Sequence, residues 1–265
     1  MQLAYYHVQA FADRSFGGNP AGVCLLENTL PDELLQKIAA ENNLSETAFC
    51  LPISSGDYQL RWFTPQVEID LCGHATLATA HVLWQYRGEL RPTLTFKTLS
   101  GLLTVDRNAR GLITLDFPSR PARPMAIPPH AAAVLSAAPF SCGLARDYLF
   151  EFQNEDEVEN LKPDFARLAT WDQGFGVIVT APGRAVDFVS RFFAPRAGVP
   201  EDPVTGSAHC TLIPYWAERL GKKILRARQV SARGGDLYCE LRGNRVKIAG
   251  HAVTYSRGII ELTVS

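Results

Sequence analysis

Short apolar runs separated by turn residues make up most of the first 120 residues. Such runs are too short for helices and are rich in β-branched and aromatic residues, so they predict strands. The pattern returns in the second half, where the turn Gly243-Asn244 joins two runs into a hairpin. The predicted strands are Tyr5–Phe11, Ala21–Leu26, Ala48–Ile53, Tyr58–Thr64, Thr93–Leu99, Leu102–Arg107, Leu112–Phe117, Phe175–Ala181, Val186–Phe193, Leu237–Leu241, Val246–Ala249 and Gly258–Val264.

Other stretches carry a helical pattern. An amphipathic helix is expected to begin at Pro31, because acidic residues follow the proline and apolar residues then recur every three or four positions. The stretches Gly73–Trp84 and Gly206–Leu220 are apolar on nearly every side, which is typical of helices enclosed by their own domain. Pro214 is expected to kink the second of these or to end it early.

The chain contains an internal repeat. When the sequence is shifted by 130 positions, five identities and two aromatic exchanges fall within 14 positions, where average composition gives about one identity. Three extra residues follow in the second half, so that Gly73 matches Gly206. The identities are Pro52/Pro182, Asp57/Asp187, Arg61/Arg191, Phe63/Phe193 and Pro65/Pro195. The sequence therefore predicts an α+β protein of two related domains, each with strands around a helix.

A proline-rich connector places the domain boundary near residue 120. We expect an N-terminal half at 1–120 and a C-terminal half at 121–265, with the last strand a candidate to join the N-terminal half. The net charge of -1 and the absence of basic runs argue against nucleic acid as a partner. The apolar runs are too short to span a membrane. Six scattered cysteines without a Cys-x-x-Cys pair, and no signal peptide, favour free thiols and a cytoplasmic location.

Glu46 is the first candidate for a catalytic residue, because the second half of the repeat has no glutamate at the matching position. Its counterpart at the offset of 130 is Gly176, although the neighbouring apolar positions match in character. A fold needs the same core in both halves, whereas a catalyst needs only one copy of an acid or base. On residue type alone, a solvent-exposed glutamate is the commoner explanation.

The starts of the two central helices are candidates for binding a substrate carboxylate. Their first backbone N–H groups lack helical partners, and the helix dipole favours an anion there. Ordinary capping is the alternative explanation for the same residues. His74 and Asp202 are polar groups at these starts that could act on a substrate or position Glu46. The binding candidates are Cys72, Gly73, Thr205, Gly206 and Ser207.

Motifs for cofactors are absent from the sequence. There is no P-loop and no Gly-x-Gly-x-x-Gly after a strand, which argues against nucleotide cofactors. Zinc bound by Cys72, His74, His209 and Cys210 is disfavoured, because these spacings fit no familiar ligand pattern. Ser207 lacks the Gly-x-Ser-x-Gly elbow of serine hydrolases. We therefore expect neither a metal nor an organic cofactor.

Four motifs of the chain resemble those of the PhzF-like isomerases, a family named for the phenazine-biosynthesis enzyme and placed within the diaminopimelate epimerase-like superfamily. The resemblance runs nearly end to end, and four blocks occur in the family's order. They are Tyr6-His7-Val8-Gln9-Ala10-Phe11 with Gly18-Asn19-Pro20-Ala21-Gly22-Val23, Asn43-Leu44-Ser45-Glu46-Thr47-Ala48-Phe49, Arg61-Trp62-Phe63-Thr64-Pro65 leading to Cys72-Gly73-His74-Ala75-Thr76, and Glu201-Asp202-Pro203-Val204-Thr205-Gly206-Ser207-Ala208.

The resemblance implies two pseudo-symmetric domains, each a β-sheet curled around a central helix, with the site between them and commonly a homodimer. It also implies that Glu46 is the acid/base and that His74, Asp202 and Ser207 line the pocket. The related epimerases use two facing cysteines. Cys72 matches the first, but the second falls near Pro203, so a two-thiol mechanism is incomplete here.

The sequence as a whole predicts a cofactor-independent isomerase that moves a proton on a small carboxylate-bearing metabolite, with Glu46, His74 and Asp202 as catalytic residues. Two alternatives stay open. One is an epimerase that uses Cys72 together with a carboxylate. The other is a two-domain protein that binds a carboxylate through its helix ends without chemistry.

Overall fold

The computed structural model describes residues 1–54 and 57–263. Contacts divide the chain into two units. The first unit contains Met1–Asp116 together with the segment from Ala249 onward, and the second contains Phe117–Ile248. Both units mix strands with a few helices, and the predicted α+β class is confirmed.

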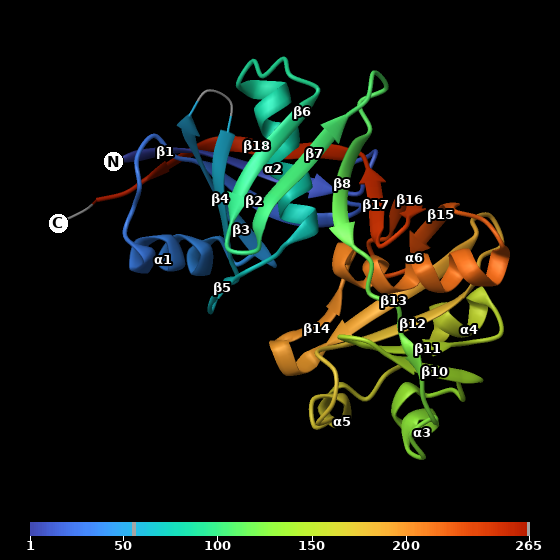
Figure 1. The fold of residues 1–265 in the computed structure, drawn as a ribbon. Helices are drawn as coiled ribbons and strands as arrows, with labels where there is room; N and C mark the ends of the chain where they lie inside the picture. The colour runs from blue at the N-terminus through green and yellow to red at the C-terminus, as the bar shows by residue number, and fades with distance from the viewer. Residues whose placement is uncertain (55–56, 264–265) are drawn as a thin grey trace. The chain divides into compact units, whose positions relative to one another are not determined.

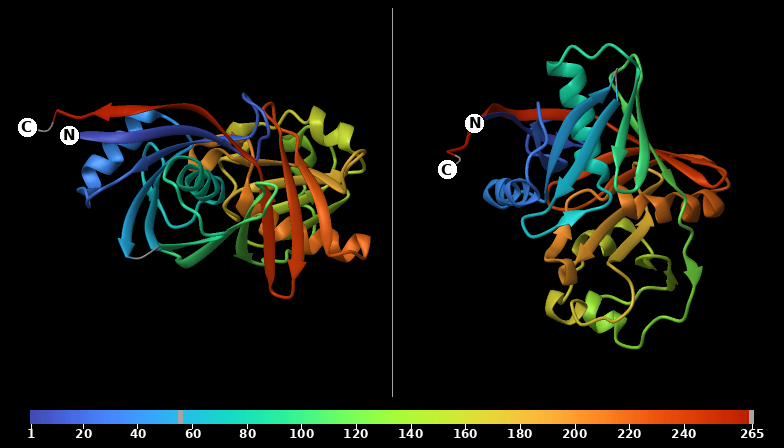
Figure 2. Two further views of the ribbon diagram at one scale, coloured as in Figure 1. Left: turned by 90° about the horizontal axis from the view of Figure 1, so that it is seen from above. Right: turned by 60° about the vertical axis from the view of Figure 1, so that its left-hand side comes forward.

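The first unit forms a sheet curled around one helix. Figures 1 and 2 show α2 (Gly73–Tyr86) surrounded by the strands of this unit, and ten of its residues are buried. The predicted enclosure of this helix is therefore confirmed. The other elements of the unit are β1 (Gln2–Ala10), β2 (Asn19–Leu25), α1 (Asp32–Asn42), β3 (Glu46–Ser54), β4 (Asp57–Phe63), β5 (Glu68–Ile69), β6 (Thr93–Thr98), β7 (Gly101–Arg107), β8 (Ile113–Pro118, which ends in the second unit) and β18 (Ala252–Glu261).

The pairing of these strands is mixed. β1 is antiparallel to both β18 and β2, β2 is parallel to β3, and β3 is antiparallel to β4. β4 is parallel to β6, which continues through antiparallel β7 and β8. On the outer side, α1 packs Leu35, Ile38 and Ala39 against Phe49 and Phe63 of the sheet.

The second unit also has a long buried helix, α6 (Gly206–Leu220). Its strand pairing repeats that of the first unit: β11 is parallel to β12, β12 antiparallel to β13, β13 parallel to β15, and β15 antiparallel to β16. The remaining elements are β9 (Arg123–Pro124), α3 (Ala131–Leu135), β10 (Ser141–Leu144), β11 (Tyr148–Glu151), α4 (Glu155–Asn160), α5 (Phe165–Leu168), β12 (Val177–Pro182), β13 (Phe188–Ala194), η1 (Pro195–Ala197), β14 (Val199–Asp202), β15 (Ile224–Gln229), β16 (Gly235–Arg242) and β17 (Arg245–Gly250, which ends in the first unit).

The identities of the repeat have a structural cause. Arg61 makes a two-point ion pair with Glu68, at 2.6 and 2.7 Å, and lies 5.1 Å from the ring centroid of Phe63. In the second unit, Arg191 makes the same pair with Glu201, at 2.7 and 2.9 Å, and lies 5.0 Å from the Phe193 ring. A planar guanidinium suits both contacts at once. The repeated arginines therefore serve the fold of each unit.

Pro214 does not end α6 early, which was one of the two outcomes expected from the sequence. Proline removes the hydrogen bond to the carbonyl four residues earlier, which here belongs to Cys210. That carbonyl accepts a hydrogen bond from the backbone N–H of Arg120 at 2.8 Å. Because a neighbouring segment replaces the missing donor, the helix continues to Leu220.

The last strand also differs from its prediction. Gly258–Val264 was expected, whereas β18 spans Ala252–Glu261, and Val264 lies outside the described residues. Most residues of β18 are exposed, so its beginning carries no hydrophobic alternation that a sequence reading could detect. Among the described residues, no helix combines the length and the apolar character needed to cross a membrane.

Packing leaves no room for a side chain at position 176. A Cβ atom at this position would lie 2.4 Å from Cζ of Phe192 and 3.0 Å from the carbonyl oxygen of Phe193. The Phe192 side chain is almost fully buried and cannot swing away. The absence of a glutamate at this twin of Glu46 is therefore required by the second unit itself, and the asymmetry alone says less about catalysis than the sequence suggested.

Gly176→Ala is accordingly expected to lower the free energy of unfolding by about 1 to 2 kcal/mol, because overpacking exceeds the gain from a less flexible unfolded chain. Urea unfolding followed by circular dichroism measures the change. Gly258→Ala is the matched control, since its Cβ would meet no atom within 4 Å, and it should stay within about 0.5 kcal/mol of the original protein. Equal stability of the two variants would contradict the packing argument.

Candidate active site

Glu46 lies just after helix α1, at the first residue of strand β3. The helix ends at Asn42, and the next residue, Asn43, adopts the left-handed conformation (φ 48°) that asparagine tolerates well. Three residues later, Glu46 opens β3 and pairs with Ala21 on β2. Only 15% of its side chain is exposed. A short connection thus turns a charged side chain inward at the first residue of a strand.

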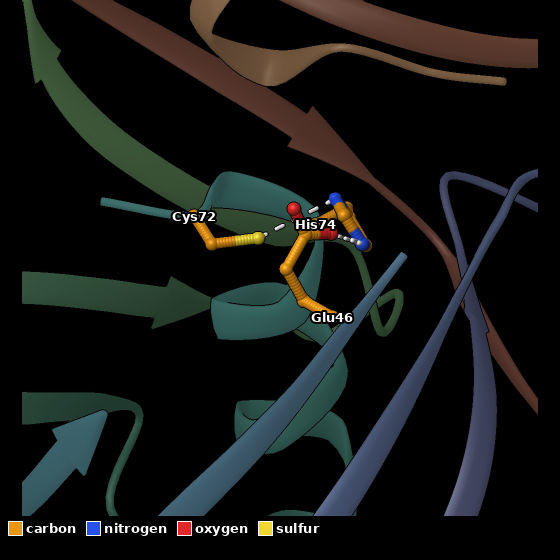
Figure 3. Close-up of side chains that lie close together, drawn as sticks. All are labelled: Glu46, Cys72 and His74. Atoms are coloured by element: carbon orange, nitrogen blue, oxygen red, sulfur yellow. Dashed lines mark hydrogen bonds and ion pairs between the residues drawn. The ribbon is translucent and has the colours of Figure 1, made fainter. Parts of the chain in front are cut away.

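His74 lies beside this carboxylate. It is the second residue of α2 and is buried. Its Nε2 atom is 3.0 Å from Oε2 of Glu46, the separation of an ion pair. Sγ of Cys72 lies 3.5 Å from the other ring nitrogen, Nδ1. Figure 3 shows Glu46 and Cys72 approaching the imidazole from β3 and from the start of α2. The structure therefore brings together three of the residues predicted from the sequence.

The charges in this cluster are coupled. Burial by itself would lower the pKa of His74, but anionic charge on Cys72 and Glu46 outweighs burial and holds that pKa well above its ordinary value. Burial raises the pKa of the Cys72 thiol to about 11, and the charge of Glu46 adds to this effect. Because the thiol keeps its proton at neutral pH, the Glu46 carboxylate is the anion that stabilises protonated His74 there.

Asn19 is a member of this cluster that sequence reasoning did not identify. It is fully buried at the start of β2, and its Nδ2 atom is 3.3 Å from Nδ1 of His74. The residue belongs to the block Gly18-Asn19-Pro20, but the sequence assigned no chemistry to it. The signal available was a polar side chain opening an otherwise apolar strand, since buried polar groups usually have a specific partner.

The helix start of the second unit gathers the other candidates. Thr205 precedes α6, and its hydroxyl donates to Oδ2 of Asp202 at 2.5 Å. Gln229 binds this loop three times: its Oε1 accepts from the backbone N–H of Thr205 at 2.8 Å, and its Nε2 donates to the carbonyl of Asp202 at 2.6 Å and to the hydroxyl of Thr205 at 3.2 Å. Arg146 donates to the hydroxyl of Ser207 at 3.1 Å. Sequence reasoning named neither Gln229 nor Arg146, because both come from distant segments.

One group of side chains in the described residues could hold a metal ion, and it differs from the set weighed from the sequence. It consists of Glu46, Cys72 and His74, whose ligand atoms all lie within 4.8 Å of one another. His209 is engaged elsewhere, because its Nδ1 atom binds the carbonyl of Thr205 at 2.8 Å. Cys210 is a buried thiol in the same helix, α6.

Comparison with known proteins identifies the family. The model of the family described as phenazine biosynthesis-like protein matches residues 8–258. The chain belongs to the PhzC/PhzF family. This finding confirms the resemblance drawn from the four sequence blocks.

Relatives within the PhzC/PhzF family match over almost their full length. An uncharacterized isomerase of Pseudomonas aeruginosa is 51% identical over 265 residues, which cover 99% of this chain and 100% of the relative. The crystal structure of a PhzF-family protein from Enterococcus faecalis superposes with a TM-score of 0.96 at 49% identity, covering 99% of this chain and 100% of that one. These relatives make this chain an isomerase-type enzyme.

The fold extends to epimerases. A hydroxyproline epimerase from Agrobacterium vitis shares the fold with a TM-score of 0.63 and 11% identity, covering 98% of this chain and 92% of that one. The predicted relation to epimerase-like folds is therefore confirmed for the architecture, and at this identity the likeness concerns the fold alone.

Proposed function

We propose that this PhzC/PhzF-family protein is a cofactor-independent isomerase that moves a proton on a small carboxylate-bearing metabolite, with Glu46 as the acid/base. The observation that carries the proposal is the contact between Glu46 and His74, 3.0 Å apart and largely shielded from water. A carboxylate in such a place can take a proton from one carbon and return a proton to another.

His74 supports this chemistry through charge. With its pKa held well above the ordinary value, His74 places a positive charge next to the carboxylate of Glu46. When Glu46 takes a proton, its charge disappears and the stabilisation of protonated His74 weakens. The pair can therefore share one proton between the two steps of an isomerisation, and His74 acts as a partner of Glu46 in the proposal.

The start of α2 supports a substrate that carries a carboxylate. Cys72 occupies the N-cap position of this helix, and no side chain caps the helix by a hydrogen bond. The first backbone N–H groups, from Gly73 onward, are thus suited to an anionic substrate group next to Glu46. Asp202 remains a catalytic candidate from the sequence, and Thr205, Gly206 and Ser207 remain substrate-binding candidates. A homodimer and a cytoplasmic location remain expectations of the same kind.

The epimerase alternative is weakened by the environment of Cys72. A thiol that abstracts a proton must first become a thiolate. Burial raises the pKa of Cys72 to about 11, so the thiol is a poor base at neutral pH. Glu46 is the better base in this cluster.

Hydrogen isotope exchange tests the proposed function. The protein, freed of metal ions by EDTA, is incubated in D₂O with a set of small carboxylic acids that have a C–H bond next to an activated carbon. Mass spectrometry should show one deuterium entering the product of an accepted substrate, since the carbon proton passes through a carboxylate that can exchange with solvent. A substrate that is isomerised only after a metal or nucleotide cofactor is added would refute cofactor independence.

A further inference from the structure

The contact between Glu46 and His74 is an ion pair only while the histidine is protonated. Although Nε2 of His74 and Oε2 of Glu46 are only 3.0 Å apart, both atoms are buried and neither has a hydrogen-bond partner in the described part of the chain. When His74 is neutral and Nε2 carries no proton, two acceptor atoms face each other. A metal cation between the two atoms would satisfy both of them at once.

The spacing of these two atoms fits a metal ion. Zinc binds histidine nitrogen at about 2.0 to 2.1 Å and carboxylate oxygen at about 2.0 to 2.2 Å. Two donors 3.0 Å apart can therefore both reach one ion without moving. The pair comes from the first residue of β3 and the first turn of α2, and sites built on such regular elements are held firmly.

Cys72 completes a set of three donors. Its Sγ atom belongs to the group whose ligand atoms all lie within 4.8 Å of one another. At the tetrahedral angle, bonds of about 2.0 Å to nitrogen and about 2.3 Å to sulfur place these two donors about 3.5 Å apart. Closing the set from 4.8 Å therefore requires the thiol to move by up to about 1.3 Å. Sulfur, nitrogen and oxygen donors from three side chains form the kind of open zinc site in which water takes the fourth position.

Asn19 supplies the supporting contact that such sites use. A histidine that binds a metal through one nitrogen usually donates the other N–H to an oxygen acceptor. Nδ1 of His74 faces the side-chain amide of Asn19 at 3.3 Å. Because the two ends of an amide exchange places by a half-turn, Asn19 can present its oxygen to Nδ1–H while Nε2 binds the ion.

We propose that Glu46, Cys72 and His74 form a reversible, inhibitory binding site for Zn²⁺. As the Zn–N and Zn–S bonds form, His74 releases the proton of Nε2 and the Cys72 thiol releases its own proton, both to solvent, and the carboxylate of Glu46 binds the ion. The acid/base is then unable to accept a proton from substrate. The inhibition rests on the proposed isomerase function, whereas binding of the ion depends only on the three donors.

Metal titration tests the site without a substrate. The full chain, purified without a histidine tag and treated with EDTA, is titrated with Zn²⁺ by calorimetry and with Co²⁺ by absorption spectroscopy. We expect one ion per chain, with a thiolate-to-cobalt absorption band. Cys72→Ser and Glu46→Gln should each weaken binding by about tenfold or more. Cys142→Ser and His130→Gln are matched controls from the second unit and should bind as the original protein does.

Three results would overturn the site: no stoichiometric binding, equal binding by the Cys72→Ser and Glu46→Gln variants, or loss of binding in the Cys142→Ser control. If Cys72→Ser does not fold, the ¹¹³Cd resonance of the original protein decides, because a shift without a sulfur contribution excludes Cys72 as a ligand. A failed titration leaves the deuterium result untouched, and absent deuterium uptake leaves a measured ion stoichiometry standing.

Discussion

Glu46→Gln is expected to lower kcat/KM for the proton transfer by about 10²- to 10⁴-fold. Glutamine keeps the size of glutamate but has no basic oxygen, so the substrate proton has no acceptor. His74 also loses the neighbouring charge that holds its pKa well above the ordinary value. Deuterium uptake from D₂O into the product, followed by mass spectrometry, measures the rate for both proteins.

Glu41→Gln is the matched control for this experiment. Glu41 lies on α1 of the same unit and is exposed, so its variant should exchange at the original rate. Circular dichroism should show both variants folded. Turnover by Glu46→Gln within a factor of a few of the original rate would remove Glu46 from the acid/base role.

Acid is expected to destabilise the second unit through His209. Burial, the larger effect, lowers the pKa of His209 to about 4 against a weaker opposing hydrogen bond to Thr205. In the unfolded chain the pKa is about 6.5. Between these values the unfolded chain binds a proton that the folded chain does not bind, so stability is present above pH 6.5 and is lost as the pH falls. The free energy of unfolding should drop by about 2 kcal/mol from pH 7 to pH 5, and by roughly 3 kcal/mol at pH 4.

His209→Asn isolates this contribution. Asparagine places an N–H donor where Nδ1 of His209 binds the carbonyl of Thr205, but it does not titrate. Urea unfolding at a series of pH values should show a slope smaller than that of the original protein by the amount given above. The acid sensitivity of His81, whose pKa burial and Arg107 lower to about 4, remains in both proteins. An unchanged slope would contradict the assignment to His209.

The fold was largely readable from the sequence because its periodic signals are strong. The apolar run from Gly73 predicted a buried central helix, and α2 is buried on nearly all sides. Elements that depend on distant partners were not readable. The continuity of α6 past Pro214 depends on the backbone N–H of Arg120. β14 was missed because its four residues form no apolar run. β15 was missed because arginines alternate with its buried residues Leu225 and Ala227 and the third buried residue is Gln229.

The candidate site could be predicted from the sequence only in part. Glu46, His74 and Cys72 occur in distinct motifs, and the structure brings them together in the first unit. The contribution of Asn19 depends on the pairing of β2 with β3, which no local motif encodes. At Gly176 the sequence suggested more than the structure supports. The difference between Gly176 and Glu46 suggested a catalytic role for Glu46, but the buried Phe192 ring by itself excludes a side chain at position 176.

The pairing of β1 with β18 bears on how the chain folds during synthesis. The second unit is a single stretch of sequence, so it can fold as soon as that stretch has left the ribosome. The first unit is interrupted, and Gln2–Ala10 stays without one of its two partner strands until Ala252–Glu261 has been made. The unit that is translated first is therefore the last to be completed, and the strand edge of β1 is open to chaperones, or to incorrect pairing, for nearly the whole time of translation.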